Sequence, residues 1–78
     1  MLEIGVVLKF CRRTKQGILW VRRRRVPFFL AQRGVVEEKR LRPLRKGDRR
    51  ELPERRGVLW VEVVESEYGL YVIRWAVK

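Results

Sequence analysis

Four consecutive arginines, Arg22 to Arg25, follow directly after the apolar run Gly17-Ile18-Leu19-Trp20-Val21. Guanidinium groups donate paired hydrogen bonds to phosphate oxygens, so clustered arginines are suited to phosphate binding. Like charges side by side at the end of a strand repel one another, which favours a state in which an anion neutralises them. The run therefore predicts contact with the phosphates of DNA or RNA, with little sequence specificity.

Two neighbouring groups of residues extend this prediction. Arg12, Arg13 and Lys15 form a basic segment ahead of the apolar run and are expected to widen the phosphate-binding patch. Phe28 and Phe29 follow the arginines directly, which would place rings for base stacking beside the phosphate donors. A hydrophobic plug at one end of a barrel explains the two phenylalanines equally well.

The other aromatic residues divide into two groups. Trp20, Trp60 and Trp75 lie in strand-like segments at positions compatible with a core, so we expect each of them to be buried. Tyr68 lies between Glu67 and Gly69 in a turn-like segment and is a candidate for exposure.

The alternative interpretation of the arginine run is a solvated surface whose cations pair with carboxylates. From Lys9 to Arg25 the chain has eight cations and no anion, so local partners are missing, and nucleic-acid binding is favoured. The second basic cluster, between Lys39 and Arg56, contains Asp48, Glu51 and Glu54, and for this cluster self-neutralisation and function are equally supported.

The composition includes few residues that could act as catalytic nucleophiles or bases. The chain has no histidine and only one serine, one threonine and one cysteine, so no nucleophile and base can be paired. The carboxylates lie among arginines that can neutralise them, which argues against a metal-dependent nuclease. We therefore expect a protein that is not an enzyme and has no catalytic residues, metal site or cofactor.

Length and charge indicate one small folded domain over residues 1–78. The chain has 78 residues, a net charge of +11 and 46% hydrophobic residues, which is enough for a small core. No apolar stretch reaches the length of a membrane span, and no signal peptide is recognisable, so we expect a cytoplasmic protein without membrane contact. Abundant charge with scarce thermolabile residues favours a thermophile source.

Alternating apolar residues predict the strands of the first half. Residues 4–10 form a half-buried strand with Ile4, Val6, Leu8 and Phe10 on its apolar face. Residues 18–25 form a return strand whose charged end projects beyond the core and which ends near Pro27.

The middle of the chain gives weaker signals. Residues 28–34 are either one helical turn or a short strand, and residues 35–41 form a short edge strand. Residues 42–56 form a long, exposed, charged loop, since proline and glycine punctuate them without a helical apolar stripe.

The C-terminal segment predicts a hairpin from residues 58–65 and 70–78, with the turn at 66–69. Tyr71, Ile73, Trp75 and Val77 are expected on one face of its second strand. The fold class is accordingly all-β: a small five-stranded antiparallel barrel of SH3-like or OB-like type, because closure removes exposed strand edges.

A second function is also compatible with the C-terminal hairpin. The strand Val58–Val64 is apolar on both faces, more than a half-exposed sheet tolerates, so it is either covered within the barrel or lies at an interface. Together with Leu70–Val77, it would then dock on a protein partner or on a second copy in a homodimer. A subunit of an assembly, including a ribonucleoprotein, is therefore the alternative hypothesis.

Overall fold

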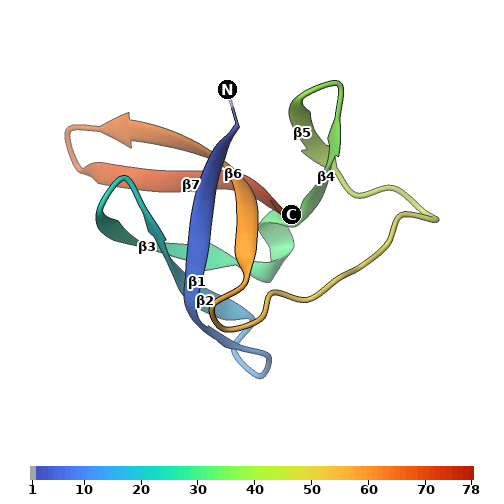
Figure 1. The fold of residues 1–78 in the computed structure, drawn as a ribbon, viewed down its shortest axis with the longest axis horizontal. Coiled ribbons are helices and arrows are strands. Elements are labelled where there is room, and N and C mark those ends of the chain that lie inside the picture. The colour runs from blue at the N-terminus through green and yellow to red at the C-terminus, as the bar shows by residue number, and fades with distance from the viewer. Residues whose placement is uncertain (1) are drawn as a thin grey trace.

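The computed structural model describes residues 2–78 and consists almost entirely of β-strands (Figure 1). Five strands form one antiparallel sheet in the order β3-β2-β1-β6-β7, which curls into a nearly closed barrel. These strands are β1 (Glu3–Cys11), β2 (Gln16–Val21), β3 (Arg24–Phe29), β6 (Val58–Ser66) and β7 (Gly69–Val77). The predicted all-β class and the five-stranded antiparallel barrel are confirmed, and the arrangement is compatible with the SH3-like and OB-like types.

The barrel closes between β3 and β7 through a few contacts, which we call the seam. The indole Nε1 of Trp75 donates a hydrogen bond of 2.8 Å to the carbonyl of Phe29. The side-chain amide of Gln32 donates one of 2.7 Å to the carbonyl of Val72, and Arg33 forms an isolated parallel bridge with Trp75. Gln32 ends the single 3₁₀ turn, η1 (Leu30–Gln32), so residues 28–34 are part strand and part helical turn.

The core lies inside the barrel and is centred on aromatic side chains. Phe28 and Trp75 are fully buried and meet edge to face, with ring centroids 5.5 Å apart. Leu19, Leu59 and Val61 fill the space around them. The expected burial of Trp75 is confirmed, whereas the exposure considered for Phe28 is wrong, because alternation along β3 turns this ring inward.

The apolar face predicted for the first strand is wrong over most of its length. Gly5 and Val7 point into the core, whereas Ile4 is 49% exposed on the outer face. A bulge at Leu8 shifts the register between Val7 and Lys9. The alternation therefore does not continue along the strand, since a bulge re-aims the side chains that follow it.

The predicted return strand is also corrected, because it is two strands. β2 ends at Val21, and Arg22 and Arg23 form a tight turn with φ of 51° and 59° before β3 begins. Two successive residues with positive φ are typical of the type I′ hairpin turn, which matches the twist of the strands on either side. The arginine run is therefore bent back on itself and does not extend as a ribbon.

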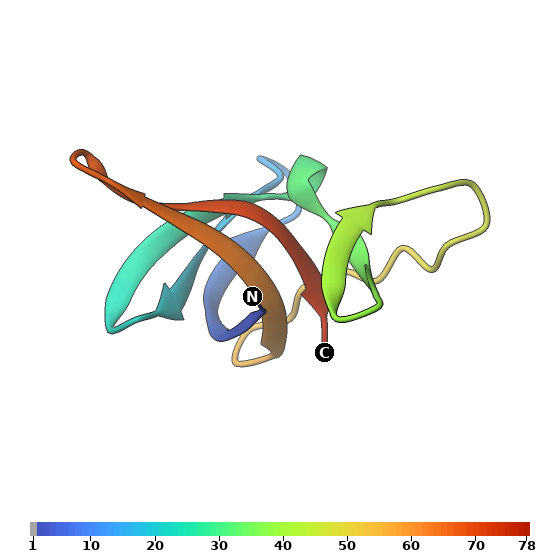
Figure 2. The same ribbon diagram turned by 90° about the horizontal axis from the view of Figure 1, so that it is seen from above.

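A second hairpin replaces the single edge strand expected at residues 35–41. It comprises β4 (Gly34–Glu37) and β5 (Arg40–Pro43), which form a separate two-stranded sheet beside the barrel. Its turn is Glu38–Lys39, again with positive φ at both residues. Residues 44–57 then form the long irregular loop, which Figure 2 shows extending away from the strands.

The C-terminal hairpin is confirmed, but the face predicted for its second strand is wrong in part. A register shift leaves Ile73 without a direct partner on β6. Trp75 consequently points inward, whereas Tyr71 and Ile73 are each 48% exposed. No helix among residues 2–78 is both long and apolar enough to cross a membrane.

Candidate nucleic-acid interface

The outer face of β2 and β3 carries an aromatic residue beside a cation. Leu19 and Val26 point into the core, so their neighbours Trp20 and Arg25 point outward. Trp20 is 43% exposed and lies directly opposite Arg25 in the β2–β3 pairing. This arrangement places a flat π-surface next to a guanidinium group, the combination that binds a base and its phosphate.

Further along the same face, Ile18 lies opposite Pro27, and Phe29 ends β3 with its side chain 40% exposed. The structure thus places Phe29, but not Phe28, where a ring can stack on a base. We call the residues Ile18, Trp20, Arg25, Pro27 and Phe29 the outer face.

Burial of all three tryptophans was expected, and for Trp20 this prediction is wrong. Trp60 is partly buried, and the ammonium of Lys78 lies 4.8 Å from the centroid of its ring. The exposure of Trp20 was difficult to foresee, because residues 18–21 are apolar at every position and give no alternating signal.

Two of the four consecutive arginines are ion-paired, contrary to the expectation that partners are missing. Arg22 forms a bidentate pair with Glu3, with an Nε to Oε1 distance of 2.8 Å. Glu65, from β6, lies 3.6 Å from Arg22 and 3.5 Å from Arg24. The hydrogen bond to Glu3 raises the pKa of Arg22 above its usual value, with a further contribution from Glu65. Carboxylates from distant segments thus neutralise part of the run.

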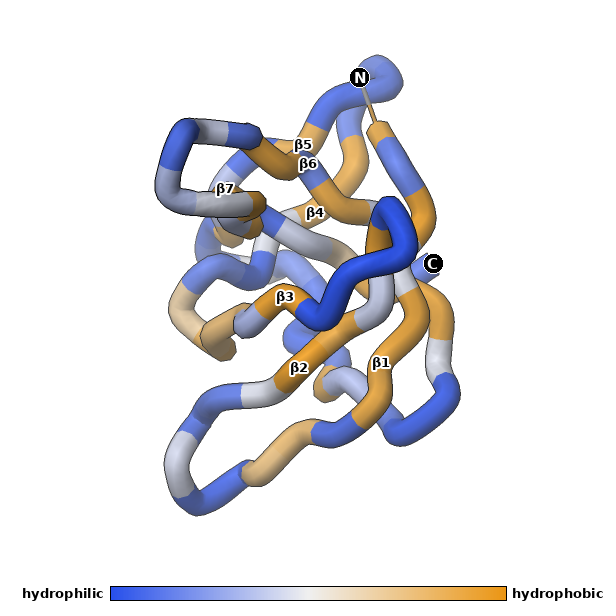
Figure 3. The backbone as a smooth tube through the Cα atoms, turned by 90° about the vertical axis from the view of Figure 1, so that its left-hand side faces the viewer, coloured by the Kyte–Doolittle hydropathy of each residue, from blue (hydrophilic) through white to orange (hydrophobic). Residues whose placement is uncertain are grey.

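Six cations along the first three strands have no ion pair within residues 2–78. They are Lys9, Arg12, Arg13, Lys15, Arg23 and Arg25. Arg23 lies in the β2–β3 turn, whereas Arg12, Arg13 and Lys15 lie in the β1–β2 loop, at the opposite end of β2 (Figure 3). The sequence suggested that the two basic segments are adjacent, but they are not. They flank the outer face and are separated by the length of β2, about 20 Å.

Within residues 2–78, two of the nine cations of the second basic cluster, Arg42 and Arg49, form ion pairs. Arg42 pairs with Glu37 at 2.7 Å and with Asp48 at 2.8 Å. The hydrogen bonds from Arg42 and from the backbone amide of Arg45 lower the pKa of Asp48 to about 2. These contacts anchor the first part of the long loop, so a structural role is favoured for Arg42.

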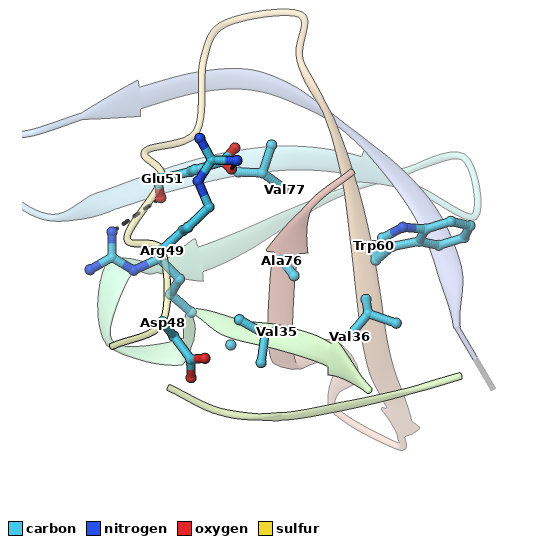
Figure 4. A pocket seen from close by; sticks show the side chains of 10 residues that line it. Val35, Val36, Asp48, Arg49, Glu51, Trp60, Ala76 and Val77 are labelled. Carbon is cyan, nitrogen blue, oxygen red and sulfur yellow. Dashed lines mark hydrogen bonds and ion pairs between the residues drawn. The ribbon is translucent and has the colours of Figure 1, made fainter. Parts of the chain in front are cut away.

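A hollow of about 350 Å³ lies between this loop and β4, β6 and β7 (Figure 4). Val35, Val36 and Ala76 form much of its apolar wall, and Asp48 and Glu51 lie at its loop side. Arg33 and Arg49 also line it, so its two cations and two carboxylates give no net positive charge, and this hollow does not extend the interface.

Comparison with protein-family models, with curated proteins and with solved structures found no match to the chain. Evidence on function therefore comes from the geometry of the outer face and of the cations around it.

Proposed function

We propose that this protein binds single-stranded nucleic acid across the outer face of β2 and β3, through stacking and phosphate contacts. The observation that supports the proposal best is Trp20, which lies half-exposed opposite Arg25 with unpaired cations at both ends of the face. A single strand exposes its bases for stacking, whereas a duplex hides them. Low sequence specificity follows, because stacking and phosphate contacts are available with every base.

The topology supports assigning the barrel to the OB type. β1, β2 and β3 are connected by short turns, and β6 returns after a long connection to pair with β1. This order, β6-β1-β2-β3, is that of a Greek key, and the OB-fold is a five-stranded, partly open Greek-key barrel. OB-folds bind oligonucleotides on the face of their second and third strands and on the loops beside it. The outer face and the Arg12–Lys15 loop occupy the corresponding positions.

Each group then has a distinct role. Trp20 and Phe29 stack on bases, Arg25 and Lys9 bind the phosphates between them, and Arg12, Arg13, Lys15 and Arg23 bind phosphates at the two ends. Arg22 and Arg24 are already paired with Glu3 and Glu65, so they contribute less to phosphate binding.

The test is a titration of labelled single-stranded DNA, single-stranded RNA and duplex DNA of equal length at several salt concentrations. If about six phosphates are neutralised, log K for the single strand falls against log salt with a slope near −4. We expect the single strands to bind more tightly than the duplex. A slope near zero, or tighter binding of the duplex, would contradict the proposal.

Arg25→Gln tests the central phosphate contact, and Arg40→Gln is its matched control. Both arginines are exposed, and neither forms an ion pair within residues 2–78, but Arg40 lies on β5, away from the outer face. We expect Arg25→Gln to reduce affinity about fivefold or more for every sequence, and Arg40→Gln to reduce it less. Equal losses would indicate attraction by net charge alone.

A second function is supported by the exposed side of the C-terminal hairpin. Val64 and Tyr71 are direct cross-strand partners, with 46% and 48% of their surfaces exposed, and Ile73 is exposed beside them. An apolar surface of this kind is suited to a protein partner or a second copy of the chain. Sedimentation at several concentrations tests self-association: a mass that stays monomeric would rule out the homodimer, and Tyr71→Ser should dissociate a dimer that forms.

A further inference from the structure

A second hollow, of about 390 Å³, opens near the β1–β2 loop, and cations dominate its polar lining. Lys15, Arg33, Arg50 and Arg74 line it, together with apolar residues at positions 30–31 and 43–44. We call this the cationic hollow. Its four cations come from the β1–β2 loop, the residue after η1, the long loop and β7, so only the folded chain brings them together.

Among residues 2–78, no carboxylate lines the cationic hollow. The six ion-pair contacts formed within residues 2–78 involve none of the four cations. Glu62 lies opposite Arg74 in the β6–β7 pairing, but its carboxylate accepts a hydrogen bond of 2.8 Å from the amide of Leu41. Within residues 2–78, no carboxylate forms an ion pair with any of the four cations around this hollow.

Arg33 shows most directly that a partner is needed. Its Nη1 donates a hydrogen bond of 3.1 Å to the carbonyl of Glu51, but its buried Nε has no hydrogen-bond acceptor within residues 2–78. A buried donor without an acceptor is costly, and the cost is greater for a charged group. Burial lowers the pKa of Arg33 below its usual value, and the nearby charge of Arg50 lowers it further.

The backbone holds two of the other cations in position. The carbonyl of Lys15 accepts a hydrogen bond of 2.9 Å from the amide of Leu30, which ties the β1–β2 loop to η1. The stem of Arg74 lies against Gly34, where an added Cβ would come within 2.8 Å of the Arg74 Cδ. Glycine at position 34 therefore leaves the space that the Arg74 side chain occupies.

We propose that the cationic hollow is a binding site for one phosphate group, held by Lys15, Arg33, Arg50 and Arg74. A phosphate has several acceptor oxygens and a negative charge, which matches four converging cationic donors. The hollow shares Lys15 with the interface, so we further assign its phosphate to the bound strand where it passes the end of β3. This second assignment rests on the proposed function.

The first experiment titrates inorganic phosphate into the protein at constant ionic strength and follows the Nε–H resonance of Arg33 by NMR. We expect a saturable shift of this resonance that chloride does not produce. The double variant Lys15→Gln/Arg50→Gln should weaken phosphate binding about tenfold or more, because charge-assisted hydrogen bonds are lost. Both residues are exposed, so the variant is expected to fold.

The matched control is Arg40→Gln/Arg55→Gln, which removes the same charge from exposed residues outside the hollow. A control with an equal loss of phosphate affinity, or an Arg33 resonance that phosphate does not shift, would overturn the proposal.

The second experiment compares oligonucleotide binding by the same variants. A larger loss for Lys15→Gln/Arg50→Gln than for the control supports the strand's phosphate as the ligand. Equal losses would overturn that assignment and leave a free phosphate or a small phosphorylated molecule as the ligand. If phosphate shifts the Arg33 resonance but no oligonucleotide binds, the phosphate site in the cationic hollow is supported and the proposed function is contradicted.

Discussion

The two ends of the β2–β3 hairpin show opposite relations between sequence and charge. At one end, four consecutive arginines form the most basic stretch of the chain, yet Arg22 and Arg24 are paired with Glu3 and Glu65. At the other end, Lys15 lines the cationic hollow together with arginines from distant parts of the sequence, and no carboxylate of the described chain lines it. Whether a charge is compensated thus depends on the fold and cannot be read from consecutive residues in the sequence.

The difference also separates two roles of arginine. A guanidinium group that already binds a carboxylate gains less from a phosphate, because it must first give up its partner. One that has a buried donor and no acceptor, as Arg33 has, gains a hydrogen bond that was missing.

The largest effect is expected for Trp75→Ala, because the seam keeps the two ends in their relative positions. Removing the fully buried indole and its hydrogen bond to Phe29 should lower the free energy of unfolding by about 3–5 kcal/mol. Urea denaturation measures the loss. Tyr71→Ala, on the same strand but 48% exposed, should lower the free energy of unfolding much less. Similar losses in the two variants would contradict a stabilising role of the seam.

Trp20→Ala removes the stacking surface between the two ends. We expect a loss of about 1–3 kcal/mol in the free energy of binding to single-stranded DNA. The free energy of unfolding should change little, since the side chain is 43% exposed. Trp20→Phe should retain most of the affinity in fluorescence titration, and a loss as large as that of the alanine variant would count against stacking.

Glu3→Gln/Glu65→Gln should leave the arginines at the β2–β3 turn without ion-pair partners, like the cations at the other end of the hairpin. Freeing Arg22 and Arg24 should raise the affinity for single strands about fivefold at low salt and steepen the salt dependence, because more phosphates are neutralised. Glu38→Gln/Glu54→Gln changes the net charge equally at residues without ion pairs in the described chain. Equal gains in both variants would show that the pairing is irrelevant.

The β2–β3 turn itself can be improved. Arg22→Asn/Arg23→Gly supplies residues that adopt positive φ readily, a change that relieves about 1 kcal/mol or more per residue. The exposed pair with Glu3 contributes little and its loss offsets only part of this relief, so we expect a net gain in stability. A lower midpoint in urea would indicate that the ion pair outweighs the turn.

The smallest effect concerns Asp48, which pairs with Arg42. Its pKa is lowered from 3.8 to about 2, so its contribution to stability is full above pH 4 and is lost as the pH falls toward 2. The stability difference between the native chain and Asp48→Asn in urea should therefore shrink between pH 4 and pH 2. A constant difference would contradict the ionic part of the contact.

The sequence predicts the strands better than the turns that connect them. The C-terminal hairpin was located because Gly69 marks its turn and strongly apolar segments lie on both sides. The turns at Arg22–Arg23 and Glu38–Lys39 were missed for one shared reason. Both place charged residues at positive φ, where glycine or asparagine is the usual signal.

The sequence predicts the type of candidate site but not which residues form it. The arginine run predicts nucleic-acid binding, and Arg25 and Phe29 lie on the outer face, where a guanidinium group can contact a phosphate and a ring can stack on a base. Bulges at Leu8 and Ile73 change which side chains point outward, and no local pattern announces them. Arg33, Arg50 and Arg74 meet only through long-range topology, so no local sequence signal could have grouped them.

The seam has one more consequence. Within residues 2–78, two side-chain hydrogen bonds and an isolated bridge close the barrel between β3 and β7, whereas the other neighbouring strands are paired over four or more residues. The seam is therefore the weakest contact between neighbouring strands of the barrel, and thermal opening of the barrel should begin there. Amide hydrogens of β3 that face β7 should exchange with solvent deuterium before those that face β2.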